Sequence, residues 1–84
     1  MKFKIKFVET GEHGESITDT VEAVDTNTAI ATFIKRHYGS GAVLHRDLGL
    51  CTGTRIYGQV MKKINDGQNR SISNSCFVDV DECL

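Results

Sequence analysis

The side chains that most often carry chemistry in a small domain are few in this chain and far apart. There are three cysteines and three histidines: Cys51, Cys76, Cys83, His13, His37 and His45. They form no Cys-x-x-Cys or His-x-x-x-His pair, which are spacings typical of zinc ligands. We therefore expect no metal and no cofactor. We interpret the cysteines as reduced, partly buried thiols, with a single disulfide as the less favoured alternative.

One cysteine has a histidine nearby in the sequence. Cys51 follows His45 by six residues and is bracketed by Gly49 and Gly53. A nucleophilic cysteine needs a base beside it and a further group that orients the base. No second acid is placed to orient the histidine, and the segment matches neither a nucleophile elbow nor a phosphate-binding glycine loop. We therefore expect that the protein is not an enzyme, and catalysis by Cys51 is the third-ranked alternative.

Charged residues form two short rows near the chain ends, one basic and one acidic: Lys2, Lys4 and Lys6, and Asp79, Asp81 and Glu82. The basic row could follow a phosphate backbone, so a small nucleic-acid-binding or regulatory protein is the alternative function. If the first and last strands are neighbours, however, the two rows are cross-strand partners and their charges cancel. With a net charge of −1 and no aromatic between the lysines, we do not expect nucleic acid as a partner. The acidic row lacks the glycine-bearing loop of a calcium site.

Surface recognition is the function that these exclusions leave. Arg55, Tyr57 and Met61 are residue types enriched in protein interfaces. If their segment is a strand, they share one face, opposite Ile56 and Val60. The alternative is that they pack beneath the helix or a loop.

The elements that would position these residues begin with a hairpin. Residues 2–9 alternate between apolar and lysine side chains, which predicts a half-buried strand, and residues 10–15 form a polar loop with two glycines. A second strand is expected over 17–24, with Glu22 opposite one of the lysines. Asp25 or Thr26 then begins a helix over 26–38, and Gly39 is expected to end it in the left-handed conformation.

The helix has an apolar stripe that should cover the hairpin: Ala29, Ile30, Phe33, Ile34 and Tyr38. Beyond it, residues 42–44 form a short apolar run and 46–53 give mixed signals.

Residues 54–64 fit either a helix or a strand. The turn signal Asn65-Asp66-Gly67 and an expected terminal strand over 70–81 favour the strand. In that terminal strand, Ile72, Cys76, Val78 and Val80 should share one face. The predicted fold is α+β, an antiparallel sheet with one helix on a face in the order β-β-α-β-β-β, with a second helix at 54–64 as the alternative.

Length and hydropathy set the remaining expectations. At 84 residues the chain has room for a single domain, 1–84, which folds alone or as a small homo-oligomer. No apolar run is long enough for a membrane span, and the alternating start does not match a signal peptide. We expect a cytoplasmic protein.

The segment Val21-Glu22-Ala23-Val24-Asp25, followed by Ala29 and Phe33, resembles a strand-to-helix pattern of small accessory proteins of bacteriophages and mobile elements. Some anti-CRISPR inhibitors are similar in size, composition and strand-strand-helix opening. The resemblance covers residues 2–38 and is one of fold pattern, so it assigns no functional residue. It implies a phage-encoded inhibitor that binds a bacterial defence complex, such as a CRISPR effector, in the host cytoplasm.

Overall fold

The computed structural model describes residues 1–11, 14–47, 55–63 and 68–83, which form one helix and six strands. The elements are β1 (Lys2–Glu9), β2 (Ser16–Glu22), α1 (Thr26–Tyr38), β3 (Ala42–Arg46), β4 (Arg55–Lys63), β5 (Asn69–Ser71) and β6 (Cys76–Cys83). The α+β class, with one helix packed on an antiparallel sheet, is confirmed. The chain has one strand more than expected, so its order is β-β-α-β-β-β-β.

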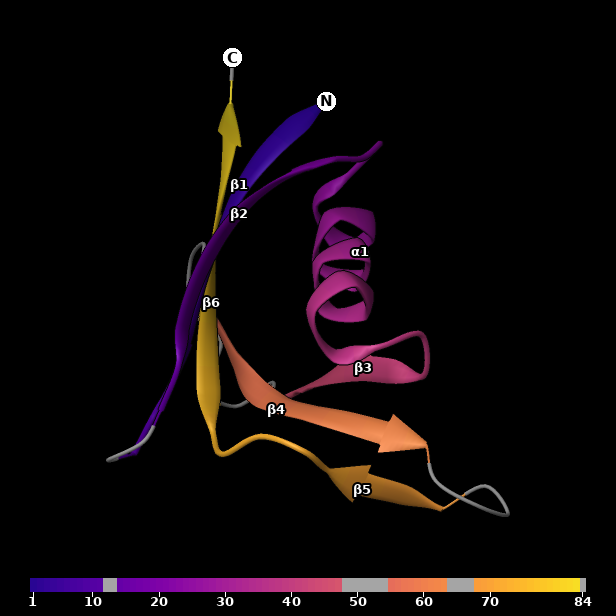
Figure 1. Cartoon of the computed structure of the whole chain (residues 1–84). Helices are drawn as coiled ribbons and strands as arrows, with labels where there is room; N and C mark the ends of the chain where they lie inside the picture. The colour runs from indigo at the N-terminus through magenta and orange to yellow at the C-terminus, as the bar shows by residue number, and fades with distance from the viewer. Residues whose placement is uncertain (12–13, 48–54, 64–67, 84) are drawn as a thin grey trace.

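The sheet has the spatial order β2-β1-β6-β4-β3, and β5 pairs with the far part of β4. The first and last strands are therefore neighbours, and the two termini lie at the same end of the molecule (Figure 1). β4 and β5 turn strongly away from the direction of β1, β2 and β6. The helix lies on the concave side of this twisted sheet (Figure 1).

The alternation in the first strand produces the expected two faces. Phe3, Ile5 and Phe7 are buried, whereas the three intervening lysines are exposed. β2 pairs with β1 in the register that places Glu22 opposite Lys2, as predicted. β2 ends at Glu22, two residues before the predicted end of that strand.

The helix begins and ends where the sequence predicts. Asp25 is the N-cap, and its carboxylate accepts a hydrogen bond from the Thr28 N–H at 2.7 Å. Gly39 ends the helix with φ 105° and ψ 164°. Its φ is positive, as expected, but its ψ is far from the left-handed helical value, so the expected left-handed cap is wrong. Tyr38 is half-buried, whereas the rest of the apolar stripe is fully buried.

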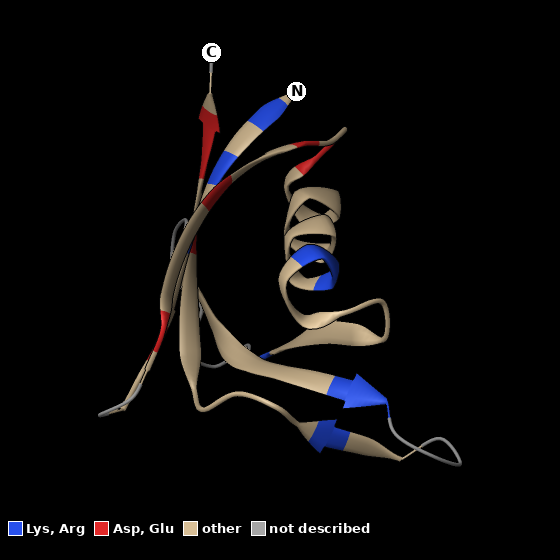
Figure 2. Ribbon diagram, viewed as in Figure 1, with Lys and Arg blue, Asp and Glu red and all other residues tan. Residues whose placement is uncertain are grey.

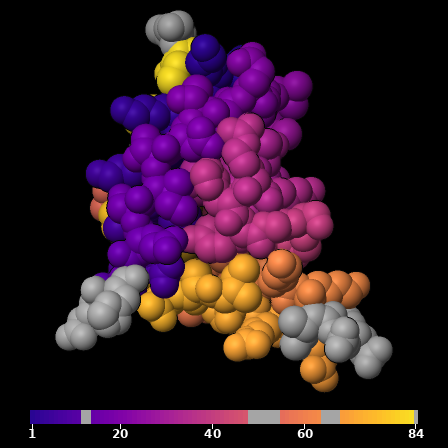
Figure 3. Space-filling model, viewed as in Figure 1, coloured from indigo at the N-terminus to yellow at the C-terminus, as the bar shows by residue number. Residues whose placement is uncertain are grey.

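One apolar core fills the space between the helix and the sheet. Its members come from all the larger elements: Phe3, Ile5, Phe7, Val21, Ala29, Ile30, Phe33, Ile34, Ala42, Val60, Cys76, Val78 and Val80. The space-filling view shows the helix lying directly against β2, with the orange surface of the C-terminal half below both (Figure 3). The expectation that the helix covers the apolar side of the hairpin is confirmed.

Residues 55–63 form a strand, so the alternative of a helix at 54–64 is wrong for the described part of that segment. The glycine that disfavours a helix here, Gly58, lies between two neighbouring strands, opposite Arg46 on β3 and Cys76 on β6. The predicted turn at 65–67 lies outside the described residues.

The expected terminal strand over 70–81 is wrong in one respect, because it is divided into β5 and β6. β5 pairs with β4 in a register that places Ser71 opposite Met61. Continued along β4, this register would place Asn74 opposite Gly58, but β6 places Cys76 there. The chain between β5 and β6 therefore contains two residues more than a continuous strand would need. In this detour the Ile72 N–H donates to the Val60 carbonyl, and the Ser73 hydroxyl accepts the Val60 N–H, each at 2.9 Å. Ile72 is 38% exposed and does not join the core.

Among the described residues, no helix is both long enough and apolar enough to span a bilayer.

Candidate functional site

The helix covers one face of the sheet, and the opposite face is not covered by any of the described elements (Figure 1). We call this opposite side the open face. The candidate residues Arg55, Tyr57 and Met61 lie there, because they alternate along β4 with Ile56 and Val60, which pack into or against the core. The predicted sharing of one face by these three residues is confirmed. Their role in binding stays a prediction.

Arg55 is held in place on the open face by a carboxylate and an aromatic ring. Its guanidinium donates two hydrogen bonds to the Asp79 carboxylate, at 2.9 and 3.0 Å, and lies 4.1 Å from the centre of the Phe77 ring. Tyr57 packs beside Phe77, with ring centroids 6.0 Å apart. Hydrogen bonding to Asp79 raises the pKa of Arg55, and the same contact lowers the pKa of Asp79. We call Arg55, Tyr57, Phe77 and Asp79 the arginine–aromatic cluster.

A hollow adjoins this cluster. Its volume is about 590 Å³, which is within the size range of ligand pockets. The residues around it come from β3, β4 and the start of β6: His45, Arg46, Asp47, Tyr57, Gly58, Gln59, Ser75 and Cys76. Tyr57 belongs to both features, so an object bound at the aromatic rings could extend a side chain into the hollow.

The lysine row lies on the open face and is balanced there. Lys4 is opposite Asp81 and Lys6 is opposite Asp79, which confirms that the basic and acidic rows are cross-strand partners. The inclusion of Glu82 in this balance is wrong, because Glu82 is opposite Phe3 and has the strand parity of the core-facing residues. Glu22 replaces it as the third carboxylate, opposite Lys2.

A different group of cations has no described carboxylate opposite it, although the Lys62 ammonium donates to the Tyr38 carbonyl at 3.4 Å. At the far end of β4, Lys62 is directly opposite Arg70 of β5, and Lys63 is opposite Asn69. Both strands carry their positive charges at the arm that projects from the body of the protein (Figure 2). Like charges across a strand pair repel each other, and a bound phosphate group would relieve that repulsion.

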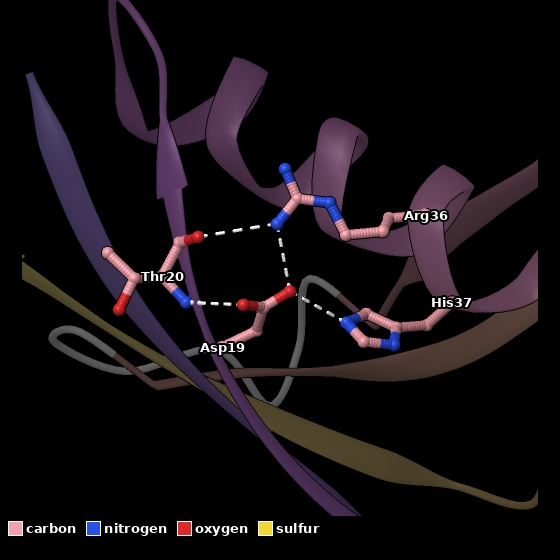
Figure 4. Close-up of polar contacts among 4 residues, drawn as sticks. All are labelled: Asp19, Thr20, Arg36 and His37. Atoms are coloured by element: carbon pink, nitrogen blue, oxygen red, sulfur yellow. Dashed lines mark hydrogen bonds and ion pairs between the residues drawn. The ribbon is translucent and has the colours of Figure 1, made fainter.

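A polar cluster that the sequence did not indicate links β2 to the last turn of the helix. One carboxylate oxygen of Asp19, Oδ2, accepts a hydrogen bond from Arg36 and is hydrogen bonded to His37, both at 2.9 Å (Figure 4). Its other oxygen accepts the Thr20 N–H at 2.8 Å, and Arg36 also donates to the Thr20 carbonyl at 3.3 Å. Hydrogen bonding lowers the pKa of Asp19 to about 2. The bond from Arg36 has the largest effect, followed by those of His37 and the Thr20 N–H.

This cluster protects the edge of the sheet. β2 is an edge strand, and the odd-numbered pairs of the β1–β2 ladder exchange the hydrogen bonds, as the bond from the Ala23 N–H to the Met1 carbonyl shows. The N–H and C=O groups of Thr20 therefore point away from β1. The Asp19 carboxylate accepts the hydrogen bond of this N–H, and Arg36 donates to this C=O. An added strand would have to displace these two side chains.

We expect Arg36→Ala and Asp19→Ala to increase self-association through β2, because each variant uncovers a backbone group of Thr20. Sedimentation velocity at high protein concentration measures this. Lys35→Ala is the matched control, since it removes a cation from the same turn without touching Thr20. Equal association of all variants would contradict the protective role.

The same carboxylate makes the stability of the wild type depend on pH. Because folding lowers the pKa of Asp19, its contribution to the free energy of unfolding is complete above about pH 4 and decreases as the pH falls toward 2.

The cysteines and histidines do not come together as a reactive group within the described part of the chain. Cys76 is buried, and burial raises the pKa of its thiol to about 11, so the thiolate is disfavoured. Cys83 is half-buried. His37 belongs to the Asp19 cluster, and His45 lines the hollow. Cys51 and His13 lie outside the described residues.

Two members of the arginine–aromatic cluster were missed as binding residues in the sequence. Phe77 follows Cys76 in what reads as a core strand, and Asp79 was assigned to the acidic row. The signal that could have identified them is alternation: residues 77, 79 and 81 must face away from Cys76, Val78 and Val80.

No family model matches this chain, and no curated protein or solved structure matches it. The resemblance to anti-CRISPR inhibitors therefore stays a prediction.

Proposed function

We propose that this is a non-catalytic protein-binding protein that contacts its partner with the open face of the sheet. The observation that carries the proposal is the arginine–aromatic cluster beside the hollow. Arginine and tyrosine are the residues that most often dominate binding energy at interfaces. Here the guanidinium is fixed by a carboxylate and a ring before any partner arrives, so less side-chain entropy is lost on binding.

The charges of the open face favour a protein partner over nucleic acid. Across β2, β1 and β6, the three lysines of the row are each opposite or beside a carboxylate of Glu22, Asp79 or Asp81. A surface of interleaved opposite charges gives no net attraction to a phosphate backbone. Such a surface can complement a folded protein that carries the reverse pattern.

The resemblance in the N-terminal half supplies the class of partner. We propose a phage-encoded inhibitor that acts in the host cytoplasm by occupying the surface of a bacterial defence complex, such as a CRISPR effector. Near-neutral charge argues against mimicry of DNA as the mode of inhibition. Stoichiometric contact through the open face is the mode that we propose.

The test has two stages. The tagged protein is first used to capture partners from lysates of bacteria with active CRISPR systems, and bound proteins are identified by mass spectrometry. A captured effector is then purified, and its cleavage of target DNA is measured with increasing amounts of the protein. We expect cleavage to stop at a stoichiometric ratio, and Arg55→Ala or Tyr57→Ala to weaken the effect about 30-fold, as for truncation of a dominant interface residue.

Lys4→Ala is the matched control, because Lys4 lies on the same face but away from the arginine–aromatic cluster. We expect this variant to weaken inhibition much less than Arg55→Ala or Tyr57→Ala does, because a charge at the rim of an interface contributes little. An effector that is captured and inhibited equally well by Arg55→Ala would contradict the proposed surface. Capture of no defence complex would contradict the proposed partner.

Nucleic-acid binding is the second candidate, and the cations of the projecting arm favour it more than the lysine row does. Lys62 and Arg70 are opposite each other without a carboxylate between them. Recovery of nucleic acid alone, in a salt-sensitive manner, would support this function. Variants of the arm and of Lys2, Lys4 and Lys6 would then show which surface is used.

A further inference from the structure

The outermost strands of the path β2-β1-β6-β4-β3 differ in how their backbone groups are used. At the β2 edge, Asp19 and Arg36 occupy the outward N–H and C=O groups of Thr20. The other edge is β3, which pairs with β4 on one side alone. Unused N–H and C=O groups on an edge strand can bind a further strand.

The register of the β3–β4 ladder determines which backbone groups of β3 point outward. The Asp47 N–H donates to the Tyr57 carbonyl at 2.8 Å, so this pair and every second pair before it exchange hydrogen bonds. The intervening pair of Leu44 and Val60 does not, and Val60 bonds to Ile72 and Ser73 on the side away from β3. The N–H and C=O groups of Leu44 therefore point away from the sheet. None of the described residues hydrogen bonds to either group.

A groove lies between this edge and the helix. One side is formed by Asn27, Ile30, Ala31 and Lys35, and the other by residues 42–44 and Arg46. Its volume is about 190 Å³, below the roughly 300 to 1,000 Å³ of small-molecule pockets, but enough for an aliphatic side chain. Arg46 reaches across the groove and donates to the Asn27 side-chain oxygen at 2.8 Å.

We propose that β3 binds an extended acidic peptide segment of a partner protein by strand addition. The segment pairs with the outward N–H and C=O of Leu44 and places an apolar side chain in the groove over Ile30 and Ala31. Its carboxylates lie near Lys35 and Arg46, which supply the positive charge along the groove. This site lies on the helix side of β3; Arg46 also borders the hollow of the open face, but the strand-addition site does not depend on the function proposed above.

The charge of the groove selects this occupant over a second copy of the chain. In a symmetric pairing of two β3 strands, each groove would receive the edge of an identical molecule. Lys35 and Arg46 of both copies would then gather at one interface, where like charges repel. An acidic segment meets the same two cations with attraction.

The probe is an acetylated and amidated heptapeptide with a central valine and a glutamate two residues to either side, all separated by threonines, so that the valine and both carboxylates share the face toward the groove. It is labelled with a fluorophore and titrated with the whole protein. Two control peptides have the same length. One replaces glutamate with lysine, and the other is N-methylated at alternate residues, which removes strand pairing while keeping the side chains. We expect binding by the first peptide alone. We also expect the Leu44 amide proton to exchange more slowly with solvent in the complex.

The protein variants test the same contacts from the other side. Leu44→Pro removes the outward N–H and should weaken binding about tenfold, the loss expected for one hydrogen bond. Thr18→Pro is its matched control, because the Thr18 N–H points outward on the β2 edge in the same way. Replacing Lys35 and Arg46 with glutamine together should weaken binding of the acidic peptide about threefold to tenfold.

Equal binding of the N-methylated peptide would overturn strand addition, and this result does not depend on whether Leu44→Pro folds. Equal binding of the lysine peptide would overturn the acidic specificity. A concentration-dependent dimer that Leu44→Pro abolishes, without peptide binding, would overturn the proposal in favour of a second copy. Absence of binding by the acidic peptide at millimolar concentration would also overturn it.

Discussion

Replacing Phe7 with alanine should remove about 4 kcal/mol from the free energy of unfolding, since large-to-small changes at buried aromatics lose contacts and leave a cavity. Phe7 is completely buried, and its ring packs 6.0 Å from that of Phe33 and 5.5 Å from that of Tyr38. A domain of this size is stable by only about 4 to 13 kcal/mol. We therefore expect the variant to retain only about 0 to 9 kcal/mol of this stability, a loss that a urea titration followed by circular dichroism measures.

The matched control is Phe77→Ala, the same change on the open face. Phe77 is half-buried and contacts Arg55 and Tyr57 rather than the core. We expect it to cost much less stability than Phe7→Ala. Equal losses from the two substitutions would mean that the open face is packed as tightly as the core, which would contradict its proposed availability for a partner.

Gly58→Ala should destabilise the protein by about 3 kcal/mol, the upper part of the range for overpacking. An alanine Cβ at this position would lie 3.0 Å from the carbonyl carbon and 3.1 Å from the Cα of the neighbouring residues His45 and Arg46. Both are backbone atoms of β3, so relief requires the two strands to separate. In an unhindered strand, the same change would instead be stabilising by roughly 0.5 to 1 kcal/mol.

Gly41→Ala controls for the general effect of adding a methyl group near this end of the sheet. Its Cβ would meet the Lys62 Cγ at 3.9 Å, which is an ordinary contact. We expect at most a small change in the urea midpoint. A Gly58→Ala protein as stable as Gly41→Ala would show that β3 and β4 are not as close as described.

Local patterns in the sequence were sufficient for the elements whose residues alternate or recur regularly. The lysine and apolar alternation defined β1 and its two faces, and Asp25, the apolar stripe and Gly39 defined the bounds of the helix. The charges at the two chain ends were expected to pair if the first and last strands are neighbours, and the sheet places β1 beside β6.

The features that the sequence did not reveal depend on contacts between distant segments. The division of the last strand arises because Ser73 can satisfy Val60 on β4, a bond between residues of different elements. The Asp19 cluster needs the helix to end beside β2, and nothing in the spacing of Asp19 and Arg36 indicates that. For the same reason the arginine–aromatic cluster was only half identified, since Phe77 and Asp79 meet Arg55 through pairing of β4 with β6.

The adjacency of the first and last strands also constrains how the protein folds during its synthesis. β1 is an interior strand, and one of its two neighbours is β6, so its pairing is incomplete until Cys76 and the following residues have been made. At typical rates of translation this takes roughly 3 to 13 seconds after β1 is finished. During that time Phe3, Ile5 and Phe7 lie on a sheet that lacks β6, one of the two neighbours of β1. A nascent chain of this protein should therefore depend on protection from aggregation until its final strand is released.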